Sequence, residues 1–192
     1  MTPVVGRSIP DALGAAEVID SEGHPHALAT RWAASDALLV FVRHFACVGC
    51  AEHLAALRPR IDEITRLGVT ATIIGSGSAD QLAAFIERED LASHDVACLT
   101  DPARAAYRAA GFQRSVWGTF GPIALGQVIR GYTHGFRNGR PEGDLHQQGG
   151  TLYVRRDGTL AFYHRAHHLG DHAKLVDVVD LALAERAQAV AP

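Results

Sequence analysis

The sequence predicts one α/β domain built on a parallel sheet, and two patterns indicate it. Short segments of four to six apolar or β-branched residues alternate with segments whose apolar residues recur every three or four positions. Such alternation is typical of buried parallel strands joined by amphipathic helices. With 192 residues, 47% of them hydrophobic and 20% charged, the chain can bury a core of ordinary size. We therefore expect a single domain over residues 1–192.

Charge and cysteine content exclude several classes of protein. The net charge is −3, with no large basic block and no apolar run of membrane-spanning length. We therefore expect neither a nucleic acid nor a membrane as partner. The first residues lack the charged-then-apolar order of a signal peptide, so we expect a cytoplasmic protein whose thiols stay reduced. Its three cysteines cannot all pair within the chain.

The first half of the chain alternates strands and helices. A polar turn inside residues 17–28 predicts a short hairpin. The continuously apolar run Ala37–Val42 and the segment Val69–Ile74, which is rich in β-branched residues, predict buried strands. Between these runs, helical spacing begins at Cys50. The expected helix ends at Gly68 and contains Pro59, and its apolar face consists of Leu54, Leu57, Ile61, Ile64 and Leu67.

A third strand and two further helices complete this region. Ser78 and Gln81 form a capping box that opens a helix over Ala79–Glu89. Val96–Leu99 is the third strand. Asp101 as N-cap and Pro102 as first helical residue then predict a helix that ends at Gly111.

The second half begins with a long connection, Gly111–Gly150, which interrupts this alternation. A helix is expected over Pro122–Phe136, and a connection of this length is usually functional when it is ordered. A hairpin then turns at Arg156-Asp157-Gly158. An amphipathic helix over Asp171–Gln188 closes the fold.

The strongest chemical signal is Cys47-Val48-Gly49-Cys50, at the junction of the first buried strand and its helix. Sites in α/β folds lie at this edge of the sheet, and the first helical turn stabilises a thiolate there. Arg43 would add positive charge. The second thiol, one helical turn away, can resolve a mixed disulfide or a sulfenic acid.

A metal site is the main alternative for the cysteine pair. Zinc would need two more ligands, and Cys98 stands alone in a short apolar strand. Nitrogen ligands could come from the histidine-rich segment around His164, His168 and His172, although we place His168 in a loop. A redox pair without metal or other cofactor is the favoured interpretation.

With these motifs, the chain resembles the peroxiredoxin-like branch of the AhpC/TSA family within the thioredoxin superfamily. The matching segments are "FVRHFACVGCAEHLAAL", "ATIIGSGSADQLAAF", "LTDPARAAYRAAGF" and "EGDLHQQGGTLYVRRDG", in the family's order. The resemblance implies a thioredoxin-like α/β fold, with a central mixed sheet flanked by helices and Gly111–Gly150 inserted before the last hairpin. It also implies thiol-dependent, antioxidant redox chemistry.

The resemblance leaves two registers open. Peroxiredoxins proper carry threonine or serine three residues before the attacking cysteine; here that position is Cys47 or His44, counted from Cys50 or Cys47. In a thioredoxin-like register Cys47 attacks and Cys50 resolves, and in a peroxiredoxin register Cys50 attacks. We prefer the first, because the residue at the mouth of a helix is more exposed to its dipole. Thioredoxins also carry a cis-proline where this chain has Gly149-Gly150.

We therefore expect an oxidoreductase whose redox-active disulfide, formed by Cys47 and Cys50, reduces a peroxide or a disulfide, with Arg43 assisting. Its electron donor would be thioredoxin, glutathione or a similar thiol, and the closing helix could offer a homodimer surface. Two other functions stay open. One is a non-enzymatic zinc-binding or redox-sensing module, and the other is an enzyme for one metabolic reduction, for instance of a lipid endoperoxide.

Overall fold

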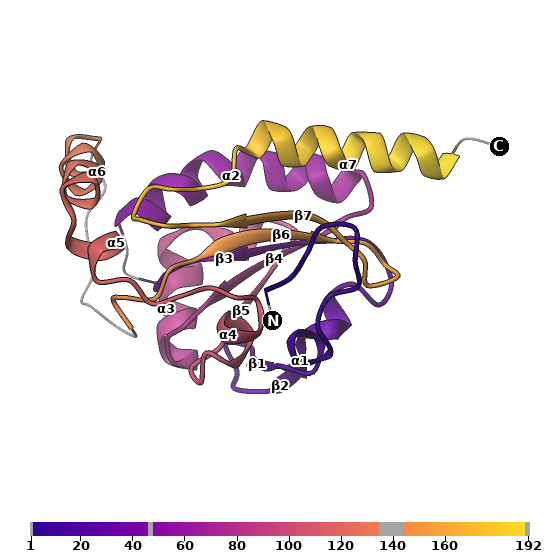
Figure 1. Ribbon diagram of the computed structural model, residues 1–192, viewed down its shortest axis with the longest axis horizontal. Helices are drawn as coiled ribbons and strands as arrows, with labels where there is room; N and C mark the ends of the chain where they lie inside the picture. Colours follow the sequence, from indigo (N-terminus) through magenta and orange to yellow (C-terminus); the bar gives the residue numbers. More distant parts are fainter. Residues whose placement is uncertain (1, 46–47, 135–143, 191–192) are drawn as a thin grey trace.

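A seven-stranded sheet forms the centre of the computed structural model, which describes residues 2–45, 48–134 and 144–190 (Figure 1). Across the sheet the strand order is β2-β1-β5-β4-β3-β6-β7. The strands are β1 (Glu17–Ile19), β2 (Pro25–Ala27), β3 (Ala37–Phe41), β4 (Thr70–Gly75), β5 (Val96–Thr100), β6 (Gly150–Val154) and β7 (Leu160–Arg165).

The sheet is mixed, as expected. β3 and β5 both run parallel to β4, with Leu39 opposite Thr72 and Thr72 opposite Ala97. The outer pairs, β1–β2, β1–β5, β3–β6 and β6–β7, are antiparallel. A parallel unit formed by β3, α2 (Val48–Arg66) and β4 therefore lies at the centre, and the cysteine pair belongs to the stretch of sequence where β3 leads into α2.

Helices cover both faces of the sheet (Figure 1). One core cluster joins α2, α3 and α7 to one face, and the other joins α1 and α4 to the opposite face. The α-helices are α1 (Asp11–Gly14), α2 (Val48–Arg66), α3 (Ala79–Arg88), α4 (Ala105–Ala109), α5 (Trp117–Phe120), α6 (Pro122–Thr133) and α7 (Leu175–Val190). None of the helices in these described segments is long and apolar enough to cross a membrane.

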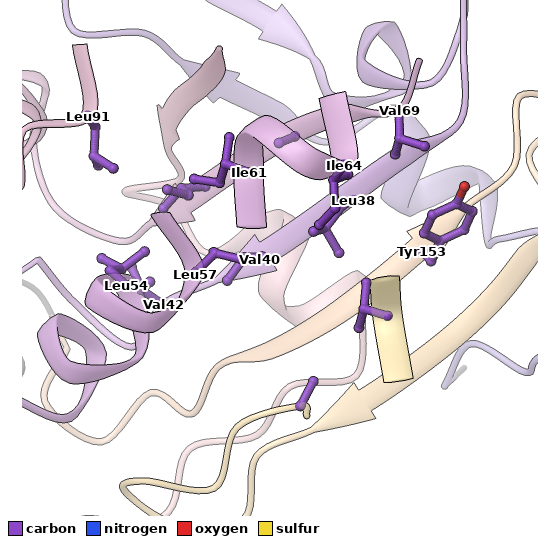
Figure 2. Close-up of a cluster of buried hydrophobic side chains, with 14 of the residues drawn as sticks. Leu38, Val40, Val42, Leu54, Leu57, Ile61, Ile64, Val69, Leu91 and Tyr153 are labelled. Carbon is purple, nitrogen blue, oxygen red and sulfur yellow. The ribbon is translucent and has the colours of Figure 1, made fainter. Parts of the chain in front are cut away.

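Helix α2 is held by the apolar face that its spacing predicts (Figure 2). The side chains of Leu54, Ile61 and Ile64 are fully buried, and that of Leu57 is nearly so. They pack with the β3 side chains Leu38 and Val40 in one cluster. Burial of each aliphatic side chain contributes about 1.5–3 kcal/mol, so this packing holds the helix that carries Cys50 firmly against the sheet.

Two expected helices begin later than the sequence predicts. Helix α4 starts at Ala105 rather than Pro102, because Arg104 takes a left-handed conformation with φ of 57°. Helix α7 starts at Leu175 rather than Asp171. The Asp171 side chain accepts a hydrogen bond from the backbone N–H of His167 at 2.8 Å, which closes a turn before the helix instead of capping it.

The expected capping box of α3 is confirmed, and it supports a stability prediction. Ser78 Oγ accepts from the backbone N–H of Gln81 at 3.3 Å, and Gln81 Oε1 accepts from the backbone N–H of Ser78 at 2.7 Å. Ser78→Ala should lower the free energy of unfolding by about 1 kcal/mol in urea denaturation. Ser8→Ala, at an exposed position outside any helix, should change it by less than about 0.5 kcal/mol. Equal effects of the two substitutions would contradict the capping role.

Candidate functional site

The cysteine pair belongs to the junction between β3 and α2. Cys47 lies outside the described residues, and Val48, the residue that follows it, is the first residue of α2. Cys50 is the third residue of the helix, although its side chain also lies outside what the structure describes. The first four backbone N–H groups of a helix lack partners within the helix and carry partial positive charge. A thiolate at this junction is therefore favoured electrostatically.

A buried tyrosine on α4 supports the strand end that leads into the junction. The Tyr107 hydroxyl lies 2.5 Å from the carbonyl oxygen of Val42 and 3.0 Å from that of Ile74, so it ties the carboxyl ends of β3 and β4 together. Tyr107 is positioned by Asp101, whose carboxylate accepts backbone hydrogen bonds from Ala105 and Ala106 at 3.0 and 2.8 Å. The Asp101-to-Tyr107 segment thus fixes where the cysteine segment begins.

Arg43 is buried, with only 2% of its surface exposed, and it anchors the Gly111–Gly150 connection. Its Nη2 donates to Thr119 Oγ1 at 2.6 Å and to the carbonyl oxygen of Leu145 at 2.7 Å. Its Nε donates to the carbonyl oxygen of Gln147 at 3.2 Å. The guanidinium group therefore joins the end of β3 to α5 and to the return of the connection toward β6.

The two ends of this connection also pair with each other. The backbone N–H of Ser115 donates to the carbonyl oxygen of His146 at 2.8 Å, and that of Gln148 donates to the carbonyl oxygen of Gln113 at 3.1 Å. The connection thus leaves and returns at one place beside Arg43. Residues 135–143, between its helical part and its return, lie outside the described residues.

The charge of Arg43 acts on the adjacent His44. Burial, and next the nearby Arg43 guanidinium, lower the pKa of His44 to about 4, although Asp144 acts in the opposite direction. Nδ1 of His44 is a buried atom with no hydrogen-bond partner among the described residues. Burial raises the pKa of Asp144, but the His146 amide, Arg114 and Arg104 outweigh it and hold that pKa below its usual range. His44 is therefore neutral at pH 7, in a positive environment.

His53, one turn after Cys50 on α2, lines a small cavity under the junction. The cavity has a volume of about 10 Å³, enough for about one water molecule. His53 is 9% exposed, and its ring stacks on that of His172 with centroids 4.2 Å apart. Burial, together with the nearby His172 and His164, lowers the pKa of His53 to about 3. The remaining polar side chains that line the cavity include Arg43, His164, His168 and Asp171.

The two glycines opposite β3 are required by close packing. A Cβ atom on Gly149 would clash with the carbonyl oxygen of Phe41, and one on Gly150 would clash with Phe112 and with the carbonyl oxygen of His164. Both glycines line the same cavity as His53. At the position where thioredoxins carry a proline, the backbone of Gly149 and Gly150 therefore packs too closely on its neighbours, including Phe41 of β3, to leave room for a side chain.

Cys98 and the histidines before α7, the other candidate residues, lie in surroundings that do not form a second site among the described residues. Cys98 lies in β5, and burial raises its pKa to about 12, so it is a neutral structural thiol. His167 and His168 lie in a loop before α7, as expected. Within the residues that the structure describes, no three His, Cys, Asp or Glu side chains are placed to hold a metal ion.

Sequence reasoning missed His53. The signal was present, because His53 follows Cys50 by three residues and so lies one helical turn further along α2. Its stacking partner His172 is distant in the sequence, and its pattern there indicates only a possible metal ligand. The catalytic roles of Cys47, Cys50 and Arg43 stay predictions. The described residues define the contacts of Arg43 and the start of helix α2, but not the cysteine side chains.

Comparison with known proteins agrees with this architecture. A family model described as "AhpC/TSA antioxidant enzyme" matches residues 54–168, a segment that begins just after the cysteine pair. A chloroplastic thioredoxin-like protein of Arabidopsis thaliana is 32% identical over 133 residues, which cover 69% of this chain. The chain spans about half, 52%, of that protein's length.

Two mammalian proteins align over more of the chain. Peroxiredoxin-like 2C of Mus musculus is 27% identical over 92% of this chain and 81% of its own length. Peroxiredoxin-like 2C of Homo sapiens is 27% identical over 93% of this chain and 82% of its own length.

Solved structures share the fold at low sequence identity. PrxQ of Xylella fastidiosa aligns with a TM-score of 0.68 and 10% identity over 96% of this chain and 98% of its own. The bacterioferritin comigratory protein of Xanthomonas campestris aligns with a TM-score of 0.64 and 13% identity, over 97% of this chain and 99% of its own. The thioredoxin-like fold with its mixed sheet is thereby confirmed.

Proposed function

Because this chain belongs to the AhpC/TSA antioxidant enzyme family, a peroxiredoxin-like family of thiol oxidoreductases, we propose that it reduces a peroxide or a disulfide through Cys47 and Cys50. The observation that carries the proposal is the placement of the pair. Cys50 lies in the first turn of α2, and the residue after Cys47 begins that helix, at the carboxyl end of β3. Cys50 thus falls in the first helical turn and Cys47 directly precedes the helix in the sequence, and a thiolate at the start of a helix is stabilised.

With a peroxide ROOH, the Cys47 thiolate attacks one peroxide oxygen and the O–O bond breaks. The sulfur keeps that oxygen as a sulfenic acid, and RO⁻ takes a proton and leaves as ROH. The Cys50 thiol then attacks the Cys47 sulfur, which forms a disulfide and releases water. A thiol donor returns two electrons and two protons. In the alternative register the two cysteines exchange roles.

The surroundings supply what this step needs. Arg43 places a buried positive charge at the end of β3, four residues before Cys47 in the sequence. His44 and His53, which precede and follow the cysteine pair in the sequence, are neutral at pH 7, so each imidazole can both donate and accept a hydrogen bond. The reducing, cytoplasmic compartment and the homodimer stay predictions.

Mass spectrometry of single Cys→Ser variants after mild peroxide treatment tests the proposal. The wild type should form a Cys47–Cys50 disulfide and leave Cys98 free. Cys50→Ser should be trapped as a sulfenic acid on Cys47, and Cys47→Ser should not be trapped. Cys98→Ser is the matched control, because its buried thiol has a pKa of about 12 and should leave the disulfide unchanged.

Other outcomes decide between the alternatives. Trapping in Cys47→Ser but not in Cys50→Ser would assign the attack to Cys50. Absence of the disulfide in the wild type and of trapping in both variants would contradict the redox function. Stoichiometric zinc in protein purified without chelator, lost in Cys47→Ser, would favour the binding module instead.

A further inference from the structure

The backbone that leads from β3 to the cysteine pair is held by side chains from three other parts of the fold. The Tyr107 hydroxyl binds the carbonyl oxygen of Val42. Ser76, directly after β4, donates from Oγ to the carbonyl oxygen of Arg43 at 3.0 Å. A third side chain binds the carbonyl oxygen of Phe45, the last described residue before the pair. Distant side chains thus fix this short segment at three of its carbonyl groups.

The third side chain is that of Arg88, the last residue of α3. Its Nη2 donates to the Phe45 carbonyl oxygen at 2.5 Å, and its Nε donates to Oε1 of the adjacent Glu89 at 3.1 Å. The guanidinium group also lies over the Phe85 ring, 5.6 Å from the ring centroid. These contacts hold the guanidinium group in one place, although 46% of the Arg88 side chain is exposed.

The ring of Phe45 is held as well as its carbonyl group. Phe45 is 3% exposed, and its ring packs on that of Phe85 with centroids 4.8 Å apart. The ring also lies directly against the loop that follows β4, where Cβ atoms built on Gly75 and Gly77 would clash with it. The chain therefore enters the cysteine segment from one defined position.

A defined approach to the cysteine pair matters for its chemistry. Attack of a thiolate on a peroxide or a disulfide needs the reacting atoms about 3–3.5 Å apart and aligned. A backbone residue that is not held samples other conformations, and ordering it again costs about a factor of ten in rate. We propose that Arg88 is a positioning residue for the cysteine pair and acts through the carbonyl group of Phe45. The inference rests on the proposed redox function.

Placement, rather than charge, is the expected contribution of Arg88. Its guanidinium group is bonded to Glu89, and nearly half of its side chain is in contact with water, so its charge is screened. Arg88→Met should therefore shift the pH of half-maximal thiol alkylation by less than about half a unit. The loss of placement should appear instead in the reaction with an oxidant, at a pH where the thiolate is fully formed.

Two reactions of the cysteine pair in the full-length protein separate these contributions. Iodoacetamide needs only an accessible thiolate, whereas hydrogen peroxide also needs the thiolate and its surroundings in place. Above the pH of half-maximal alkylation, Arg88→Met should react with hydrogen peroxide about tenfold more slowly than the wild type. Its rate of alkylation should stay within about twofold of the wild-type rate. Mass spectrometry of the peptide that contains Cys47 and Cys50 follows both reactions.

Arg58→Met is the matched control. Arg58, on α2, donates from Nη1 to the carbonyl oxygen of Glu89 at 2.9 Å. This variant therefore loses an arginine-to-carbonyl hydrogen bond at the same end of α3 without changing the contact to Phe45. It should lose a similar amount of stability in urea denaturation and react with hydrogen peroxide at the wild-type rate.

Two further variants test the same segment. Arg88→Lys keeps a donor for the Phe45 carbonyl group and should recover the peroxide rate to within about threefold of the wild type. Ser76→Ala, which removes the donor to the Arg43 carbonyl group, should slow the reaction about threefold.

A wild-type peroxide rate in folded Arg88→Met, or in Ser76→Ala where Arg88→Met does not fold, would overturn the inference. So would an equal slowing in Arg58→Met, because the effect would then follow from the stability of α3. If the wild type reacts with neither hydrogen peroxide nor hydroxyethyl disulfide at Cys47 or Cys50, the proposed function itself fails, and the inference fails with it. If only the disulfide reacts, the same rate ratios are expected with the disulfide as oxidant.

Discussion

Replacing Arg43 with methionine is expected to lower the free energy of unfolding by about 3 kcal/mol. The arginine is 2% exposed and donates to Thr119 and to the carbonyl oxygens of Leu145 and Gln147. Methionine fills much of the space but offers these buried and partly buried acceptors no donor, although the carbonyl oxygen of Leu145 keeps the Thr119 hydroxyl at 3.1 Å. Each buried acceptor that loses its partner costs about 1–3 kcal/mol, less what water entry recovers. Urea denaturation at pH 7 measures the change.

The same substitution should change the reactivity of the cysteine pair. If Arg43 stabilises the thiolate, Arg43→Met should raise the pH of half-maximal alkylation by about one unit or more. Arg43→Lys keeps the charge but cannot reproduce the planar fork of donors. Arg43→Lys should therefore lower the free energy of unfolding nearly as much as Arg43→Met does. It should shift the pH of half-maximal alkylation much less.

Arg31→Met is the matched control for this experiment. Arg31 is half-buried and donates from Nε to Thr72 Oγ1 at 3.1 Å, in a helical turn that precedes β3 rather than beside the junction. Its replacement should cost about 1 kcal/mol and leave thiol alkylation unchanged. If Arg43→Met alters stability but not the alkylation profile, Arg43 is a structural anchor and its catalytic assignment is wrong.

Acidification from pH 7 to pH 5 is expected to destabilise the protein by roughly 2 kcal/mol for each of two buried histidines. The folded-state pKa is about 4 for His44 and about 3 for His53, against about 6.5 in the unfolded chain. The unfolded chain therefore binds protons that the folded protein does not accept. The stability conferred by neutral histidines is complete above pH 6.5 and is lost as the pH falls toward the folded pKa values.

A single substitution identifies the source of this pH dependence. His53→Phe keeps an aromatic ring against His172 but cannot titrate, so it should remove about half of the loss between pH 7 and pH 5. Leu82→Ala, a buried position on α3, is the control and should destabilise the protein equally at both pH values. Carboxylates with lowered pKa values, such as Asp144 and Asp171, also stabilise the fold, but this stabilisation is lost mainly below pH 5, outside the range of the experiment. An unchanged pH dependence in His53→Phe would exclude His53 as a source.

The regular elements of the central fold could be predicted from the sequence because their signals are local. The apolar run at Ala37 became β3, and the spacing from Leu54 to Ile64 became the buried face of α2. The capping box at Ser78 and the turn at Asp157-Gly158 hold where expected. In each case the periodicity of side chains or the chemistry of a turn decides the structure within a few residues.

The first residues of two helices are set by tertiary contacts, which the spacing of apolar residues in the sequence does not reveal. Helix α7 begins four residues late because Asp171 binds the His167 amide. The late start of α4 reflects the left-handed conformation of Arg104. Local propensity is weak at such positions, so tertiary hydrogen bonds and packing determine where a helix begins.

The sequence by itself determined the family, the order of the central elements and the place of the cysteine pair at the junction of strand and helix. Only the tertiary structure decided what surrounds that junction. Arg43 meets Leu145, and His53 meets His172, across more than one hundred residues of sequence. These pairings arise from how the connection and the loop before α7 pack on the sheet. Side-chain spacing predicts which face of an element is apolar, but not which distant side chain that face will meet.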